Sequence, residues 1–178
     1  MGKRSSFERV ERDFYPTPYK AVEPLIQHLP KKQFAFAEPC AGDGALVNHI
    51  ETMTNGWCSW ASDLEPQTDT ILTRHFREIN MEDLFEADYI ITNPPWDRSL
   101  LHPMIEYFTA YRPTWLLFDA DWIHTKQSVP YMSMLKKIVS IGRVKWIEDS
   151  KSVGKDNCCW YLFDRVTSNS TKFYGRRK

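Results

Sequence analysis

The segment Asn93-Pro94-Pro95-Trp96 combines residue types that could hold and orient an amino group. Two consecutive prolines fix the backbone and lack N–H groups, so the carbonyl group of Pro94 can point outward without an internal partner. This carbonyl and the side-chain oxygen of Asn93 offer two acceptors for the two protons of an –NH2 group, which orients its lone pair for attack. Trp96 offers a flat face on which a nucleobase could stack.

The other interpretation of this segment is a rigid turn whose tryptophan fills the core. The position of the segment favours a role in catalysis, because it follows an apolar segment of strand length and lies ten residues after Asp83. An amino group of a base in a duplex is stacked and paired. A reaction there therefore requires base flipping, at a cost of roughly a few kcal/mol.

A second group of residues has the spacing of a site for a ribose-containing cofactor. Gly42 and Gly44 follow a short apolar segment and permit a tight turn close to a ligand. Asp63 lies 19 residues after Gly44, at a strand end where an acid can accept from both ribose hydroxyl groups. Glu38 can hold backbone N–H groups or face an ammonium group. Taken alone, this loop would favour an ordinary strand-to-helix turn, and the position of Asp63 is what points to a cofactor site.

Asp83 is expected to accept a hydrogen bond from the amino group of an adenine. No lysine follows the glycine loop, which excludes a phosphate-binding P-loop, and the loop lacks the third glycine of a dinucleotide site. A ligand with a ribose and an adenine but without phosphate fits these residues best. S-adenosylmethionine matches this description and is the expected cofactor.

Alternating helices and strands are expected to position these residues. The apolar pattern predicts helices at 19–29, 45–52, 68–74, 100–111 and 131–139, and strands at 34–37, 57–62, 76–79, 87–92, 114–118, 143–148 and 158–164. This alternation is typical of α/β folds and predicts a mostly parallel, Rossmann-like sheet of seven strands that ends in an antiparallel hairpin. Ligand-binding residues of such sheets lie at the carboxyl ends of the strands, so the two groups above are expected to meet at one edge.

Composition predicts one globular domain over residues 1–178. The chain contains seven Trp, eight Tyr and ten Phe, which excludes a disordered protein. No apolar run approaches the roughly 18 residues of a membrane span, and the N-terminus lacks the apolar segment of a secretion signal. The four cysteines lack zinc-ligand spacing, so reduced thiols in a cytoplasmic protein without a metal site are expected.

Basic residues are concentrated at the two ends of a chain whose net charge is zero. Residues 1–12 carry +2 and residues 165–178 carry +5, which leaves −7 for the middle. We expect a basic arm at 1–13, a catalytic core at 14–166 and a basic tail at 167–178, with the basic ends contacting phosphates of a nucleic acid. Simple solvation of frayed ends is the other interpretation. Arg98, Lys151 and Lys155 are further candidates for such contacts, although capping by Asp97 or Ser99 explains the Arg98 segment equally well.

Nearly the whole chain resembles class I S-adenosylmethionine-dependent DNA adenine-N6 methyltransferases, in particular the small phage and prophage members. The resemblance rests on an aromatic-Pro-Thr-Pro segment, an acid-Pro-x-x-Gly-x-Gly loop, a second-strand acid, an acid-Leu pair and an Asn-Pro-Pro-aromatic motif, in this order. It implies cofactor contacts by Tyr15, Thr17, Glu38, Cys40, Gly42, Gly44, Asp63, Leu64, Asp83 and Leu84, and catalysis by Asn93, Pro94, Pro95 and Trp96.

The resemblance also implies DNA as the partner and, for a phage protein, the host cytoplasm as the location. Trp96 stands where the family usually has Tyr or Phe. No segment is long enough for a separate target-recognition domain, so sequence selectivity is expected to be low or to depend on short loops. Related chemistry on an RNA base amine or a glutamine amide stays open, as does a catalytically silent module that binds a cofactor or nucleic acid.

Overall fold

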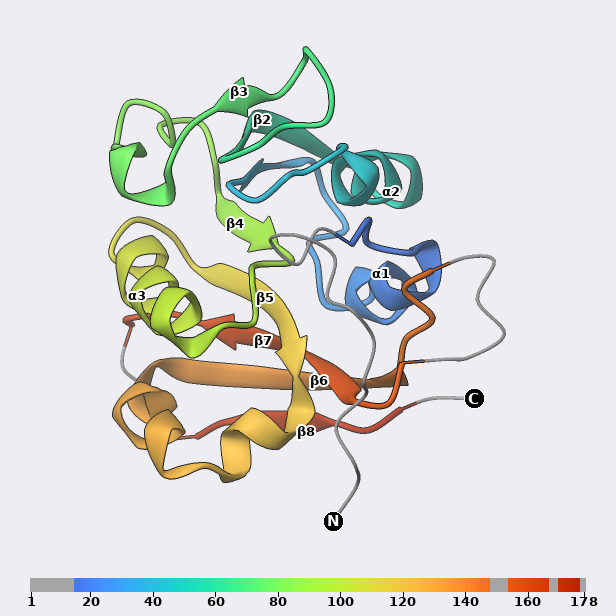
Figure 1. Ribbon diagram of the computed structural model, residues 1–178, viewed down its shortest axis with the longest axis vertical. Helices are drawn as coiled ribbons and strands as arrows, with labels where there is room; N and C mark the ends of the chain where they lie inside the picture. The colour runs from blue at the N-terminus through green and yellow to red at the C-terminus, as the bar shows by residue number, and fades with distance from the viewer. Residues whose placement is uncertain (1–14, 148–153, 167–169, 177–178) are drawn as a thin grey trace.

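Eight strands form one sheet in the order β3-β2-β1-β4-β5-β7-β6-β8 (Figure 1). The computed structural model describes residues 15–147, 154–166 and 170–176. The strands are β1 Phe34–Glu38, β2 Gly56–Asp63, β3 Leu72–Thr73, β4 Tyr89–Thr92, β5 Thr114–Asp119, β6 Leu135–Arg143, β7 Asn157–Phe163 and β8 Lys172–Tyr174. The helices are α1 Tyr19–Ile26, α2 Ala45–Met53 and α3 Arg98–Thr109, with 3-10 helices η2 Phe76–Glu78, η3 Ala120–His124 and η4 Lys126–Met134.

Within the described sheet, β7 alone runs against the other strands. β1 is parallel to β2 and β4, and β4 is parallel to β5. β7 lies antiparallel between β5 and β6, and β8 is parallel to β6. The predicted Rossmann-like α/β sheet with an antiparallel pair near its C-terminal end is therefore confirmed, with eight described strands where seven were predicted. The carboxyl ends of the parallel strands share one edge.

Helices cover both faces of the sheet, because the central strands are apolar on both sides. All five residues of β1 are buried. On one face, Phe34 and Phe36 pack in a cluster with buried residues of α1 and α2. On the other face, Leu116 and Phe118 pack in a cluster with buried residues of α3.

The indole of Trp160 connects β7 to α1 inside the cluster that contains Phe34 and Phe36. Trp160 lies on β7 and is fully buried. Its Nε1 donates a hydrogen bond to the carbonyl oxygen of Ala21 on α1 at 2.8 Å. The helix that follows the Tyr15–Thr17 segment is thereby fixed to the antiparallel strand.

Two predicted elements between β2 and β4 are wrong. Residues 68–71 form turns, and the predicted helix at 68–74 is replaced by the two-residue strand β3. The predicted strand at 76–79 is the 3-10 helix η2, which begins with a capping box. In this box, Nδ1 of His75 accepts from the backbone N–H of Arg77, and Glu78 accepts from the backbone N–H of His75.

The region before the hairpin also differs from the prediction. A helix was predicted at 131–139, but η4 ends at Met134 and β6 begins at Leu135. A strand was predicted at 143–148, but β6 ends at Arg143. β8 lies in the segment predicted as a basic tail. The predicted arm at 1–13 and Lys151 lie outside the described residues. None of the described helices is long and apolar enough to cross a membrane.

Candidate active site

A cavity of about 860 Å³ lies at the carboxyl ends of β1, β2 and β4. This volume is in the range of roughly 300–1,000 Å³ that small-molecule sites occupy. Residues predicted from the sequence form much of its wall: Tyr15, Thr17, Glu38, Cys40, Gly42, Asp63, Leu64, Asn93 and Pro95. The fold therefore brings together four segments that are far apart in the sequence. Five predicted residues are not on the wall: Gly44, Asp83, Leu84, Pro94 and Trp96.

The loop between β1 and α2 depends on two glycines in the left-handed region. Gly42 has φ 54° and Gly44 has φ 82°, conformations that favour glycine. Gly44 precedes the first residue of α2, so it shapes the turn without lining the cavity. The backbone N–H of Gly42 donates to Oδ2 of Asp63 at 2.9 Å, which ties this loop to the end of β2.

Asp63 holds two loops while it faces the cavity. Its Oδ2 accepts from the N–H of Gly42 and its Oδ1 accepts from the N–H of Glu65 at 2.8 Å. Partial burial raises the pKa of Asp63, and hydrogen bonds from the backbone N–H groups of Gly42 and Leu64 oppose this rise. Each carboxylate oxygen has a second lone pair, so the side chain retains acceptor capacity for hydroxyl groups of a ligand.

Glu38 is a buried carboxyl group that lacks a partner on one oxygen. Its side chain is 1% exposed, and no donor among the described residues reaches Oε2. Burial raises the pKa of Glu38 well above its ordinary value, and the nearby carboxylates of Asp63 and Asp43 raise it further. A buried acceptor without a donor is costly, so this oxygen fits a ligand that brings N–H groups.

Glu38→Gln is expected to stabilise the unliganded protein at pH 7 while removing an anionic acceptor from the cavity wall. A folded-state pKa above the unfolded value means that unfolding releases a proton, so stability falls as pH rises from about 4.5 toward the folded pKa. The neutral amide lacks this penalty. We expect a melting temperature a few degrees higher at pH 7, with the difference lost near pH 4, measured by thermal unfolding across pH.

The exposed Glu23→Gln provides the matched control, because the same chemical change on the outer face of α1 removes no buried charge. A Glu38→Gln protein less stable than the parent at pH 7 would contradict the expected cost of the buried carboxyl group.

Asn93 and Thr17 meet across the cavity wall. Nδ2 of Asn93 donates to Oγ1 of Thr17 at 3.2 Å, and Thr17 is 5% exposed. The amide nitrogen is thereby engaged, while no donor among the described residues reaches Oδ1 of Asn93 or the carbonyl oxygen of Pro94. Two acceptors in consecutive residues therefore remain for a ligand.

Trp96 is fixed by the neighbouring strand and by a second tryptophan. Its Nε1 donates to the carbonyl oxygen of Leu117 on β5 at 3.1 Å. Its ring meets that of Trp146 edge to face, with centroids 5.7 Å apart. Trp146 also lies 6.4 Å from the ring of Tyr15. Sequence reasoning missed Trp146, because residues 143–148 were predicted as a strand with no link to the segment Asn93–Trp96.

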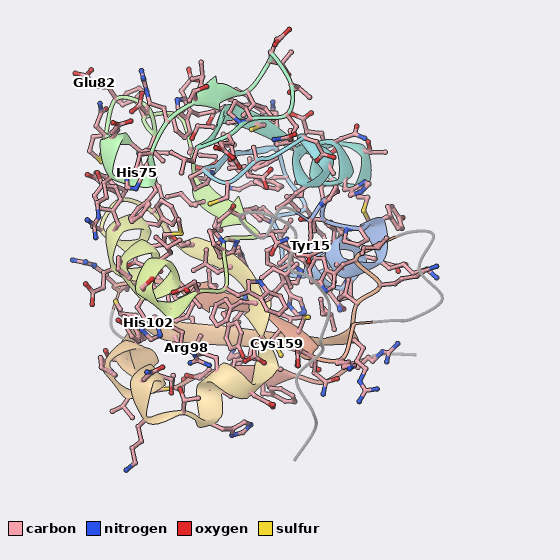
Figure 2. The ribbon with its side chains drawn as sticks, viewed as in Figure 1. Tyr15, His75, Glu82, Arg98, His102 and Cys159 are labelled. Atoms are coloured by element: carbon pink, nitrogen blue, oxygen red, sulfur yellow. The ribbon has the colours of Figure 1, made fainter. Side chains whose placement is uncertain are left out.

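Asp83 and Leu84 support the fold in this structure instead of lining the cavity. Oδ2 of Asp83 accepts from the backbone N–H of Asn80 at 2.9 Å, and Leu84 is fully buried. The wall on this side is formed by Arg74, His75 and Phe76, which the sequence analysis did not select. In the view of Figure 2, His75 lies to the left of β4 and Tyr15 lies to its right. Both residues line the cavity. The adjacent aromatic residues His75 and Phe76, in a segment that is otherwise polar, are the one sequence signal that points to this wall.

Arg98 is already occupied by protein groups. Its Nη2 lies 3.8 Å from Oδ2 of Asp119, and its Nη1 donates to Oγ1 of Thr125 at 3.3 Å. Asp97 accepts from the backbone N–H of Ser99 and caps α3. The structure thus supports the capping interpretation of this segment.

Cys40 contributes a thiol to the wall and no nucleophile. Burial and the charges of Asp63 and Glu38 raise the pKa of this thiol far above its ordinary value, with a weaker opposing effect from Thr92. A thiol of this kind stays protonated at neutral pH and contributes packing to the site.

Comparisons with known proteins identify the fold. No protein-family model matches the sequence, and no curated protein matches it. A Pyrococcus horikoshii protein assigned as an RNA methyltransferase superimposes with a TM-score of 0.59 at 13% identity, over 89% of this chain and 91% of that one. The chain has a methyltransferase fold.

Two further structures agree with this result. A Listeria monocytogenes protein assigned as a class I S-adenosylmethionine-dependent methyltransferase gives a TM-score of 0.52 at 12% identity, over 88% of this chain and 62% of that one. A chain of a type I restriction–modification system gives 0.57 at 13% identity, over 96% of this chain and 46% of that one. In this methyltransferase fold, the cavity lies at the sheet edge where ligands of α/β proteins bind.

Proposed function

We propose that the protein transfers a methyl group from S-adenosylmethionine to the N6 amino group of adenine in DNA. The observation that carries this proposal is the placement of Asn93. Its amide nitrogen is held by Thr17, its amide oxygen has no donor among the described residues, and it shares one cavity wall with Glu38 and Asp63. Asn93, the proposed acceptor for an amine, thus lines the same cavity as the proposed acceptors for a cofactor.

The cavity wall has groups suited to each part of S-adenosylmethionine. Asp63, Gly42 and Leu64 would hold the ribose, because Asp63 retains acceptor capacity at the tip of β2. Glu38 and Tyr15 would face the methionine end, where the ammonium group supplies the donors that Oε2 of Glu38 lacks. When bound, this cofactor supplies an electrophilic methyl group on a sulfonium sulfur.

Arg74, His75 and Phe76 would contact the adenine end of the cofactor, in place of Asp83. The ring of Phe76 is 5% exposed and lies beside that of His75, with centroids 4.7 Å apart. Together they present an aromatic surface to the cavity, which suits a flat heterocycle.

Two acceptors in the segment Asn93–Trp96 would hold the target amine. Oδ1 of Asn93 and the carbonyl oxygen of Pro94 each accept one N–H of the amino group, which directs its lone pair away from both. Positive charge that develops on the nitrogen during attack is stabilised by these two oxygens. The proton leaves the product ammonium afterwards, so no general base is required. Pro95 keeps the segment rigid.

Adenine in DNA is favoured by the motif order of the sequence and by the shared fold of a restriction–modification chain. RNA is the second candidate, because a protein assigned as an RNA methyltransferase has the same fold. The glycine loop, Asp63 and Asn93 are all present in one site, which argues against a silent module.

Transfer assays distinguish these substrates. The protein is incubated with tritiated S-adenosylmethionine and unmethylated DNA, RNA or a protein extract, followed by nucleoside and amino-acid analysis. We expect label in N6-methyladenine from DNA. Label confined to RNA or protein would overturn the choice of substrate, and cofactor binding without any transfer would favour the silent module.

Thr17 is expected to act on catalysis through the orientation of Asn93. Thr17→Val keeps the shape of the side chain and removes the hydroxyl acceptor, so the amide of Asn93 can rotate away from its productive orientation. We expect kcat to fall about tenfold, with cofactor affinity within about threefold of the parent and most activity retained in Thr17→Ser. A loss of cofactor affinity in the valine variant, with kcat preserved, would instead identify Thr17 as a cofactor ligand.

A further inference from the structure

Four basic side chains gather where β6 and β8 end, on the edge of the sheet that carries the cavity. Arg143 is the last residue of β6, Lys145 lies two residues later, and Arg176 lies two residues after β8. Lys155 lies in the connection from β6 to β7. All four are exposed. We call this group the edge patch.

Two local contacts bring the members of the edge patch together. The guanidinium group of Arg176 lies over Gly142, with Nη1 3.1 Å from the point that a Cβ on this glycine would occupy, so Arg176 is next to Arg143. The N–H of Gly154 donates to the carbonyl oxygen of Val144 at 2.8 Å, which places Lys155 beside Lys145.

The charge of the edge patch is not neutralised inside the described structure. Asp156 is the described carboxylate nearest in sequence, directly after Lys155. No carboxylate of the described residues forms a salt bridge with Arg143, Lys145, Lys155 or Arg176. Exposed cations that lack partners are available to an anionic ligand.

Aromatic contacts connect the edge patch to the segment Asn93–Trp96. Trp146 directly follows Lys145, and its ring meets that of Trp96 at 5.7 Å. The ring of Trp146 also lies 6.4 Å from that of Tyr15, which lines the cavity. A chain of contacts therefore leads from the cavity wall through Trp146 to the edge patch.

We propose that the edge patch binds the phosphates of a nucleic-acid strand beside the base to be methylated. This inference rests on the proposed function and names the surface that holds its substrate. Cations next to an aromatic cluster suit a strand whose backbone is held while one base enters the cavity. Contacts to phosphates position the strand without reading its sequence.

Paired charge removals at the two ends of the same strands test this inference. Arg143→Gln/Arg176→Gln removes two charges at the carboxyl ends of β6 and β8. Lys136→Gln/Lys172→Gln removes two charges near their amino ends and serves as the control. Binding of a fluorescent unmethylated DNA oligonucleotide and a matched RNA is measured by anisotropy at several salt concentrations, and cofactor affinity is measured in parallel.

We expect the carboxyl-end variant to bind the oligonucleotide about tenfold more weakly at low salt, with unchanged cofactor affinity. Its plot of log K against log salt should be shallower by about 1.4 for a single strand or about 1.8 for a duplex, and the control variant should keep the parent slope. A second pair within the edge patch, Lys145→Gln/Lys155→Gln, should weaken binding in the same way. This pair provides the test if the first variant does not fold.

The outcomes separate this inference from the proposed function. If RNA but not DNA binds with the expected dependence on the edge patch, the DNA substrate is wrong and the surface assignment holds. If DNA is methylated but the carboxyl-end and control variants bind it equally well, the surface assignment is wrong and the proposed function holds. Transfer to protein glutamine without nucleic-acid binding would overturn both.

Discussion

Replacing Asn93 with alanine is expected to reduce methyl transfer by about a thousandfold while cofactor affinity stays within about tenfold, or roughly 1.4 kcal/mol. The alanine variant would lose the oxygen that we propose accepts from the target amine and stabilises the charge developing on it. The rest of the cavity wall, including Glu38 and Asp63, is unchanged. Single-turnover rates with saturating cofactor measure the chemical step, and calorimetry measures cofactor binding.

Two further variants sharpen this prediction. Asn93→Asp keeps an acceptor and is expected to retain measurable transfer, although it cannot donate to Thr17. Asn48→Ala removes an exposed asparagine side chain from α2 and is expected to behave as the parent. A large loss of cofactor affinity in Asn93→Ala, with transfer unchanged at saturation, would contradict the catalytic role and place Asn93 in the cofactor site.

Asp63→Ala is expected to weaken binding of S-adenosylmethionine about a hundredfold, or roughly 2.7 kcal/mol. The substitution removes the proposed acceptor for the ribose and also frees the N–H groups of Gly42 and Glu65. Both loops at this end of β1 and β2 lose a shared anchor. Equilibrium dialysis or calorimetry with the cofactor measures the loss directly.

Asp88→Ala is the matched control for Asp63→Ala. Oδ2 of Asp88 accepts from the backbone N–H of Ala35 at 2.9 Å, so this carboxylate also anchors β1, but near the amino end of the strand. We expect Asp88→Ala to lower stability and to leave cofactor affinity near the parent value. Equal losses of affinity in the two variants would show that general destabilisation, and not the ribose contact, explains the effect of Asp63.

The central sheet could be predicted because its strands carry strong local patterns. β1 and β5 are continuous apolar segments, as expected for strands covered on both faces, and each ends in a polar residue at the predicted edge. The convergence of Glu38, Asp63 and Asn93 followed from strand direction alone, because the carboxyl ends of parallel strands share one edge.

β6 was predicted as a helix because bulges alter its apolar spacing. Its pairing with β7 shifts register between Leu135 and Lys137 and again between Ser140 and Gly142. Each shift moves the alternation of buried and exposed side chains by one residue. The buried residues Ile138 and Val139 therefore lie three and four positions after Leu135, which is the spacing of one face of a helix. β8 is three residues long with an exposed lysine and phenylalanine at its start, a pattern too short to indicate a strand.

The cavity wall that we propose contacts the adenine of the cofactor could not be predicted from spacing alone. Asp83 has the residue type and the sequence position expected of a cofactor contact, but its carboxylate closes a local turn on Asn80. His75 and Phe76 reach the wall because η2 turns the chain after β3. A 3-10 turn of three residues has no periodicity that a sequence pattern could show.

The hydrogen bond between Trp160 and Ala21 couples one wall of the cavity to a strand that is distant in the sequence. α1 packs in part on buried residues of β6 and β7, so its position depends on the antiparallel part of the sheet. Thr17 lies just before the start of α1 and lines the cavity. A substitution that loosens the packing of β7 is therefore expected to shift this part of the cavity wall as well as the sheet.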